Sequence, residues 1–268
     1  METFYFGETS KLLYGAYHPA REFKDRKVGV VLCYPIINEY LRSHRAFVRL
    51  ATQLATEGFH VLRFDYFGCG DSYGDDVDGS LIEWTENLLT AIDELKNGCD
   101  ASHICLIGLR MGATLALLAA EKRNDIDSMV LWEPIVNGEQ YVREIKRLHL
   151  ESAVIEGLPK AVKGQTDANH HLEILGFQIP DIMLDELLKL DLLSMKQCPA
   201  KKILYMENSD DYDRGNFMNH LKHLGTDVEE TNISYASIWL EGDNESYTGL
   251  VPVNALEHIV KWVTESHS

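Results

Sequence analysis

The sequence predicts an α/β protein with a mostly parallel central sheet and helices on both of its faces. Segments typical of strands and of helices alternate along most of the 268 residues. Some strand segments, such as GVVLCYP, are continuously apolar, which is typical of strands buried on both faces. The segments between them carry apolar residues at helical spacing.

The first elements are two opening strands at residues 3–6 and 11–17, followed by a buried strand at 28–34. A helix is expected at 44–57, because its apolar residues recur on one face. Gly58 then ends this helix, since glycine readily adopts the left-handed conformation found after a helix C-terminus.

Two strands, each followed by a helix, come next. Residues 60–66 form a strand, and 80–98 form an amphipathic helix with Ser80 opening a capping box. A strand at 103–109 runs directly into a helix at 110–123. That helix is apolar nearly all round, so we expect it to be central and buried.

The alternation breaks after a strand at 128–135, and no strand is expected between about Gly138 and Cys198. We interpret residues 1–137 and 199–268 as one core, with 138–198 as a helical lid insertion above the carboxyl ends of the strands. The remaining elements are helices at 139–150, 181–193, 214–224 and 252–265 and strands at 201–208 and 233–242.

The charge and the cysteines narrow the class of protein. The formal charge is −17, which disfavours nucleic-acid binding and docking on anionic membranes. No apolar run is long enough for a membrane span, and the first residues lack the pattern of a signal peptide. The five cysteines are scattered without a CxxC pair, so we expect a cytoplasmic protein with no structural zinc. No cofactor is indicated.

The turn at residues 108–112, GLRMG, is the most informative stretch of the sequence. A strand, a G-x-x-x-G turn and a buried helix form the layout of a nucleophile elbow, whose middle residue sits in a strained conformation. Glycines are needed on both sides because strand and helix approach too closely there for side chains.

With this elbow and the stretch 44–75, the chain resembles the α/β-hydrolase family, particularly its serine-aminopeptidase-like branch. The stretch matches that branch's helix, its G-[FY]-x-V-L-x-x-D segment and its G-x-G-x-S segment. Within the branch the chain is most similar to hydrolase-like proteins that accompany bacterial exosortase and related biosynthetic gene clusters. The resemblance implies an α/β-hydrolase fold and, by analogy only, chemistry on ester, thioester or amide bonds.

The chain departs from the family at two members of the catalytic triad. The middle residue of the elbow, usually Ser, is Arg110, whose guanidinium stays protonated and cannot act as a nucleophile. No histidine follows the last expected strand before His258, where the family places its general base. An acid is available in the family's position, at Asp210, Asp211 or Asp213. These departures argue against Ser-His-Asp hydrolysis.

Arg110 has two interpretations, which can both hold. The backbone N–H groups at a helix N-terminus favour anions, so Arg110 there would contact a ligand carboxylate or phosphate. Alternatively, Arg110 pairs internally with a carboxylate, because a buried cation needs a partner. The candidate partners are Glu39, expected in the loop after the third strand, Glu133, which follows the sixth, and the acidic loop 241–245.

We therefore expect an anionic or acyl small molecule to bind at the elbow, with non-standard or no hydrolytic activity. The alternatives are an esterase, thioesterase or acyltransferase with a displaced nucleophile, such as Cys69 or Ser72, and a non-catalytic scaffold for a biosynthetic enzyme. A homodimer through the apolar segment 182–193 also stays open. The candidate catalytic residues are Arg110, Glu39, Glu133, Asp210 and Asp211, and the candidate ligand-binding residues are Asn38, Met111, Tyr34 and Ile36.

Overall fold

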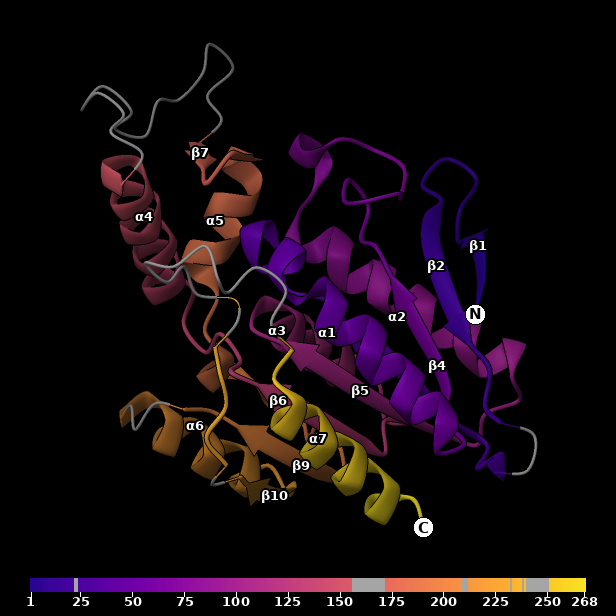
Figure 1. Ribbon diagram of the computed structural model, residues 1–268. Helices are drawn as coiled ribbons and strands as arrows, with labels where there is room; N and C mark the ends of the chain where they lie inside the picture. Colours follow the sequence, from indigo (N-terminus) through magenta and orange to yellow (C-terminus); the bar gives the residue numbers. More distant parts are fainter. Residues whose placement is uncertain (22–23, 156–171, 209–211, 232, 238, 240–250) are drawn as a thin grey trace.

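The computed structural model has an eight-stranded sheet at its centre (Figure 1). The strand order is β1-β2-β4-β3-β5-β6-β9-β10, and every pairing from β4 to β10 is parallel. Within this sheet, the described residues pair antiparallel in the hairpin β1–β2 and in its contact with β4. The structure describes residues 1–21, 24–155, 172–208, 212–231, 233–237, 239 and 251–268.

The strands of this sheet agree with the segments that the apolar runs predict, apart from the last one. Their bounds are β1 (Glu2–Phe6), β2 (Leu13–His18), β3 (Val28–Cys33), β4 (His60–Phe64), β5 (His103–Leu109), β6 (Ser128–Trp132), β9 (Lys202–Met206) and β10 (Asp227–Glu230).

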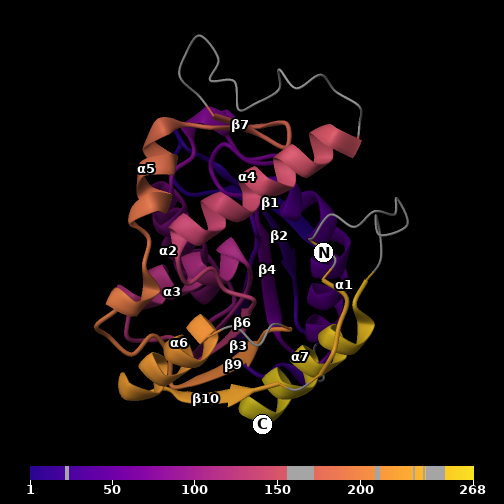
Figure 2. The same ribbon diagram turned by 90° about the vertical axis from the view of Figure 1, so that its left-hand side faces the viewer.

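Helices cover both faces of the sheet (Figure 2). One face carries α1 (Ile37–Thr56) and α7 (Val253–Ser266), and the other carries α2 (Leu81–Gly98) and α3 (Met111–Glu121). The helix α6 (Tyr212–His223) borders the β10 edge. At the start of α2 the Ser80 Oγ accepts a hydrogen bond from the Glu83 backbone N–H (3.1 Å), which confirms the expected N-cap.

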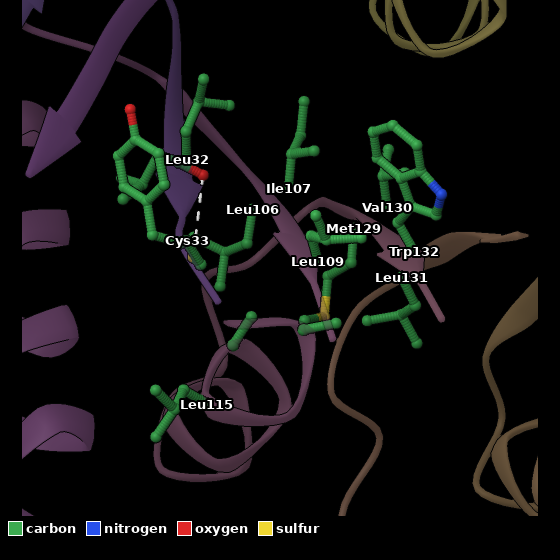
Figure 3. Packing of buried hydrophobic residues seen from close by; sticks show 14 of the residues in the cluster. Leu32, Cys33, Leu106, Ile107, Leu109, Leu115, Met129, Val130, Leu131 and Trp132 are labelled. Carbon is green, nitrogen blue, oxygen red and sulfur yellow. Dashed lines mark hydrogen bonds between the residues drawn. The ribbon is translucent and has the colours of Figure 1, made fainter. Parts of the chain in front are cut away.

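The strands β3, β5 and β6 lie side by side in the sheet, and every residue of β3 and β6 is buried. Figure 3 shows the alternation of side chains that follows from this: Ile107, Val130 and Trp132 lie on one side of the sheet, and Leu131 lies on the other with Leu115 of α3. Strands buried on both faces read as unbroken apolar runs for this reason.

The segment between β6 and β9 lies beyond the carboxyl ends of the strands (Figure 1). It contains α4 (Gly138–Ile155), β7 (Leu172–Ile174), β8 (Phe177–Ile179), α5 (Asp181–Lys189) and the short helix η3 (Leu192–Ser194). Its two ends are fastened together, because the Gly138 N–H donates to the Leu190 carbonyl (2.9 Å) and the Leu192 N–H donates to the Val136 carbonyl (2.9 Å).

Three expectations about the elements are wrong. The hairpin β7–β8 lies in the segment where no strand was expected; its strands of three residues are too short to show alternation. The helix α1 begins at Ile37 rather than at residue 44, so the residues expected in a loop after the third strand form its first turns. The last strand is the mostly exposed edge strand β10, and the described residues of 233–242 form no strand.

The apolar character of 233–242 has a different cause from sheet formation. Tyr235 and Trp239 are both buried, with ring centroids 5.6 and 5.4 Å from that of Trp132. This segment therefore covers the end of β6 with aromatic side chains. Sequence periodicity alone does not separate burial of this kind from burial within a sheet.

Candidate functional site

The elbow between β5 and α3 has the strained geometry that its glycines predict. Arg110 has a positive φ of 53° with ψ −122°, a backbone conformation that residues other than glycine rarely adopt. A Cβ atom at Gly112 would lie 2.1 Å from the Cys33 carbonyl oxygen, and one at Gly108 would lie 2.4 Å from the backbone nitrogen of Ala113. Both positions therefore require glycine, and they hold Arg110 at the carboxyl end of the sheet.

The Arg110 side chain is fixed by two carboxylates from different parts of the fold. Its Nε donates to Glu39 Oε1 (3.0 Å) in α1, and its Nη2 donates to Glu144 Oε2 (2.7 Å) in α4. Its guanidinium carbon also lies 5.7 Å from the ring centre of Tyr141. The side chains of Arg110 and Glu39 are 10% and 9% exposed, so their ion pair is shielded from water, whereas the Glu144 side chain is 28% exposed.

Burial and the neighbouring charges shift the pKa values of Arg110 and Glu39. Burial by itself would lower the pKa of Arg110, but the Glu39 and Glu144 carboxylates outweigh it and raise that pKa, so Arg110 stays protonated. Burial raises the pKa of Glu39 in spite of the opposing Arg110 charge. The positive charge of Arg110 is thus already matched within the protein.

The internal pair between Arg110 and Glu39 is therefore present, but Glu39 lies in the first turn of α1 and not in a loop. Sequence analysis did not identify Glu144 and Tyr141. Their signal was spacing: they are three residues apart on an expected helix and so share one face. Nothing in the sequence placed that face over the elbow.

Glu133 follows β6 directly and also has an unusual backbone, with φ 47°. Its N–H donates to the Met206 carbonyl (2.7 Å), and its Oε1 accepts a hydrogen bond from the Tyr235 hydroxyl (3.3 Å). Burial raises the pKa of Glu133 to about 7, against the opposing effects of the Arg110 charge and of hydrogen bonding. Glu133 is therefore poised to change its charge near neutral pH.

This pKa makes the stability of the protein depend on pH. Between the usual value of 4.5 and about 7, the unfolded chain releases the Glu133 proton while the folded chain retains it. Ionisation of Glu133 thus lowers the free energy of unfolding as pH rises through this window, by up to about 3 kcal/mol. Glu133→Gln is expected to remove that loss.

Urea denaturation of the wild type and Glu133→Gln at pH 4.5 and pH 8 measures the effect. From pH 4.5 to pH 8, the free energy of unfolding of the variant should rise by up to about 3 kcal/mol relative to that of the wild type. Glu257→Gln, at an exposed position of α7, is the matched control and should not change the pH dependence. If the difference in free energy of unfolding between Glu133→Gln and the wild type is the same at both pH values, the raised pKa of Glu133 is contradicted.

The four candidate ligand-binding residues lie around the elbow with different degrees of access. Tyr34 is buried, and its hydroxyl accepts a hydrogen bond from Arg63 Nη1 (2.9 Å). Ile36 is the N-cap residue of α1, and Asn38 follows in its first turn, half-buried. Met111 is the first residue of α3 and is buried.

Several candidates fall outside the described residues: Asp210, Asp211 and the acidic loop 241–245. A serine–histidine hydrogen bond does occur elsewhere in the described chain, between Ser128 and His267 (2.8 Å). Ser128 is at the amino end of β6, whereas Arg110 is at the carboxyl end of the sheet, so this pair is remote from the elbow.

The two alternative nucleophiles are engaged in structural roles. The Ser72 Oγ donates to the Asp65 carbonyl (2.5 Å) and accepts from the Tyr14 N–H (2.8 Å). Burial raises the pKa of the Cys69 thiol to about 12, so this thiol stays protonated and weakly nucleophilic.

A cavity of about 180 Å³ lies beside the first turn of α1. Its walls come from the start of α1, the glycine-rich loop 68–70, α2 and the hairpin β7–β8 with the adjoining α5. Within the described residues, no group of three or more His, Cys, Asp or Glu side chains is arranged to hold a metal ion. None of the helices in that same part of the chain is long and apolar enough to cross a membrane.

Comparison with known proteins places the site in context. A family model described as serine aminopeptidase S33 matches residues 35–172, about half of the chain. Human protein ABHD12B is 34% identical over 99 residues, a match that spans 35% of this chain and 26% of that protein. The chain therefore covers only about a quarter of the length of this curated relative.

Solved structures of similar fold align over nearly the whole chain. Est1E from Butyrivibrio proteoclasticus with bound ferulic acid has a TM-score of 0.70 and 17% identity, with 98% of each chain covered. An esterase from Pyrococcus furiosus has a TM-score of 0.62 and 15% identity, covering 100% of this chain and 91% of its own. Mouse alpha/beta hydrolase domain-containing protein 10 has a TM-score of 0.58 and 14% identity, with 99% of each chain covered. At these identities the similarity shows a shared fold.

Proposed function

Because the chain belongs to the serine aminopeptidase S33 family of α/β-hydrolases, we propose from its altered elbow that it binds a small acyl-type molecule without nucleophilic hydrolysis. The observation that carries the proposal is Arg110, held by Glu39 and Glu144 where this family needs a nucleophile. A protonated guanidinium has no lone pair for attack on a carbonyl carbon.

The choice between an acyl and an anionic ligand follows from the charges. Arg110 already faces two carboxylates at 3.0 and 2.7 Å, so an anion would have to displace one of them. An uncharged acyl group needs no such exchange and can use the apolar cavity beside α1. In this proposal the segment of α4, β7–β8 and α5 acts as a lid over the ligand.

A fluorophosphonate probe tests the proposal, because such probes modify activated serines. The purified protein is incubated with the probe and its intact mass is measured, beside an active serine esterase as positive control. We expect no adduct, and no hydrolysis of p-nitrophenyl acetate or of an acyl thioester above the rate in buffer.

An adduct, or turnover that survives purification, would overturn the proposal and favour an esterase or acyltransferase with a displaced nucleophile. Ser72→Ala and Cys69→Ala then locate the reactive group. Loss of turnover in Cys69→Ala alone would identify the thiol.

A second function, proton transfer by Glu133, is favoured by one observation. Glu133 combines a pKa of about 7 with a strained backbone and a nearby cation, Arg110, which are features suited to a general acid or base. Such a step needs charge stabilisation and positioning but no covalent intermediate. The wild type would then catalyse a proton-transfer reaction although it forms no fluorophosphonate adduct. Glu133→Gln would lose that activity.

Partnership with a biosynthetic enzyme, or a homodimer, is compatible with a protein that binds without hydrolysis. Within 182–193, Ile182, Leu188 and Leu193 are exposed at 60%, 44% and 39%. Analytical ultracentrifugation of the wild type and Ile182→Glu would distinguish a dimer held by this segment from a monomer.

A further inference from the structure

The cavity beside α1 is distinct from the Arg110 cluster, because neither Arg110 nor its partners line it. Five wall residues are almost completely buried: Ile36, Tyr66, Trp84, Ile179 and Met183. The glycine-rich loop supplies Gly68, Cys69 and Gly70. The hairpin β7–β8 closes one side with Phe177 and Gln178.

Two side-chain donors of the wall are engaged within the protein, whereas the buried Tyr66 hydroxyl has no hydrogen-bond partner among the described residues. The Tyr40 hydroxyl donates to Asp65 Oδ1 (2.8 Å), and the Trp84 Nε1–H donates to the Phe67 carbonyl (2.9 Å). The Gly68 N–H donates to the Tyr73 carbonyl (2.8 Å). A ligand with several polar groups would therefore find few partners in this cavity, and burying those groups unpaired is costly.

The charge of the wall excludes anions. No lysine, arginine or histidine is among the residues that line the cavity, and the one acidic residue is Asp76, at an exposed position. The protein as a whole carries a formal charge of −17. An anionic ligand would be repelled by Asp76 and would gain no ion pair.

The wall also contains a strained residue. Ile37, the first residue of α1, has φ 58°, a conformation that a β-branched side chain rarely adopts. Strain of this kind persists only where surrounding structure enforces it, and it is concentrated at binding and catalytic sites. At Ile37 the strain turns the chain from β3 into α1 along the cavity.

From the lining, the charge and the size, we infer that this cavity binds a small uncharged, mainly apolar molecule about as large as a substituted benzene ring. An apolar cavity of about 150 Å³ takes up benzene, and this one measures about 180 Å³. The inference rests on the proposed function and narrows it, since it limits the uncharged ligand to a molecule of about this size.

Toluene and benzoate form a matched pair of probes, similar in shape and different in charge. The protein is labelled with ¹³C at its seven methionine methyl groups, and the Met183 signal is assigned with Met183→Leu. Toluene should shift the Met183 signal saturably, because Met183 lines the cavity. Benzoate at the same concentration should leave it in place.

Two variants narrow the cavity from different walls: Leu41→Trp at an exposed position of α1 and Cys69→Leu in the glycine-rich loop. Each should weaken toluene binding at least tenfold. Ile82→Trp is the matched control, because Ile82 is 64% exposed, close to the 61% of Leu41, and does not line the cavity. Its toluene affinity should equal that of the wild type.

A Met183 signal that does not move with toluene, or that moves equally with benzoate, would overturn the inference. So would unchanged toluene binding in both narrowing variants. These failures are distinguishable from failure of the proposed function: a fluorophosphonate adduct in a protein that binds toluene would overturn only the absence of hydrolysis.

Discussion

Replacing Arg110 by methionine is expected to lower the free energy of unfolding by about 3 kcal/mol at neutral pH. The change removes the cation that matches Glu39 and Glu144, and leaves Glu39, which is only 7% exposed, without its ion-pair partner. Methionine keeps much of the volume of the side chain, so the loss measures charge rather than packing. Urea denaturation of Arg110→Met and the wild type gives the value.

Two controls distinguish the loss of the buried ion pairs of Arg110 from the effect of replacing any arginine by methionine. Arg147 pairs with Glu151 at 2.8 Å on the surface of α4, with 63% of its side chain exposed, so Arg147→Met should cost under about 1 kcal/mol. The triple variant Arg110→Met, Glu39→Gln, Glu144→Gln should recover most of the loss, because it removes the unmatched carboxylates as well. A small effect of Arg110→Met, or no recovery in the triple variant, would show that the cluster does not hold the elbow.

Gly112→Ala is expected to destabilise the protein by more than about 3 kcal/mol, or to prevent folding. Its Cβ would lie 2.1 Å from the Cys33 carbonyl oxygen and 2.4 Å from that of Tyr34, and both are backbone atoms of the chain leaving β3. Neither atom can move without displacing the central strand or α3. The soluble yield and the melting temperature of the variant report the effect.

Gly98→Ala is the matched control, because it is also a helical glycine but has no atom within 4 Å of the new Cβ. Replacing glycine by alanine at such a position should be neutral or stabilise by up to about 1 kcal/mol. Comparable losses in the two variants would mean that Gly112 is not required by the close approach of α3 to β3.

The sequence was most informative where burial was complete. Residues 28–34 and 103–109 read as apolar runs because β3 and β5 are covered on both faces. The GLRMG turn predicted the elbow because it stands between a predicted strand and a helix that is apolar nearly all round, and a Cβ atom at either glycine would clash with backbone atoms. The resemblance to the α/β-hydrolases, drawn from these stretches, is confirmed by the family match and by the shared fold.

The sequence was less informative about short or exposed elements. The edge strand β10 has an exposed, acidic face and no apolar run, and β7 and β8 have three residues each. The aromatic residues at 235 and 239 suggested a strand, although they are buried by packing on Trp132. Local patterns report burial, but they do not report which partner provides it.

The sequence by itself determined that the elbow carries an arginine, that no histidine lies between residues 223 and 258, and that Arg110 needs a counter-charge if buried. Only the tertiary structure decided which carboxylates supply it. Glu39 and Glu144 are 71 and 34 residues from Arg110, and they meet it because α1 and α4 both converge on the carboxyl end of the sheet. Contacts between such distant positions depend on how helices pack over the sheet, which the periodicity of any single helix does not encode.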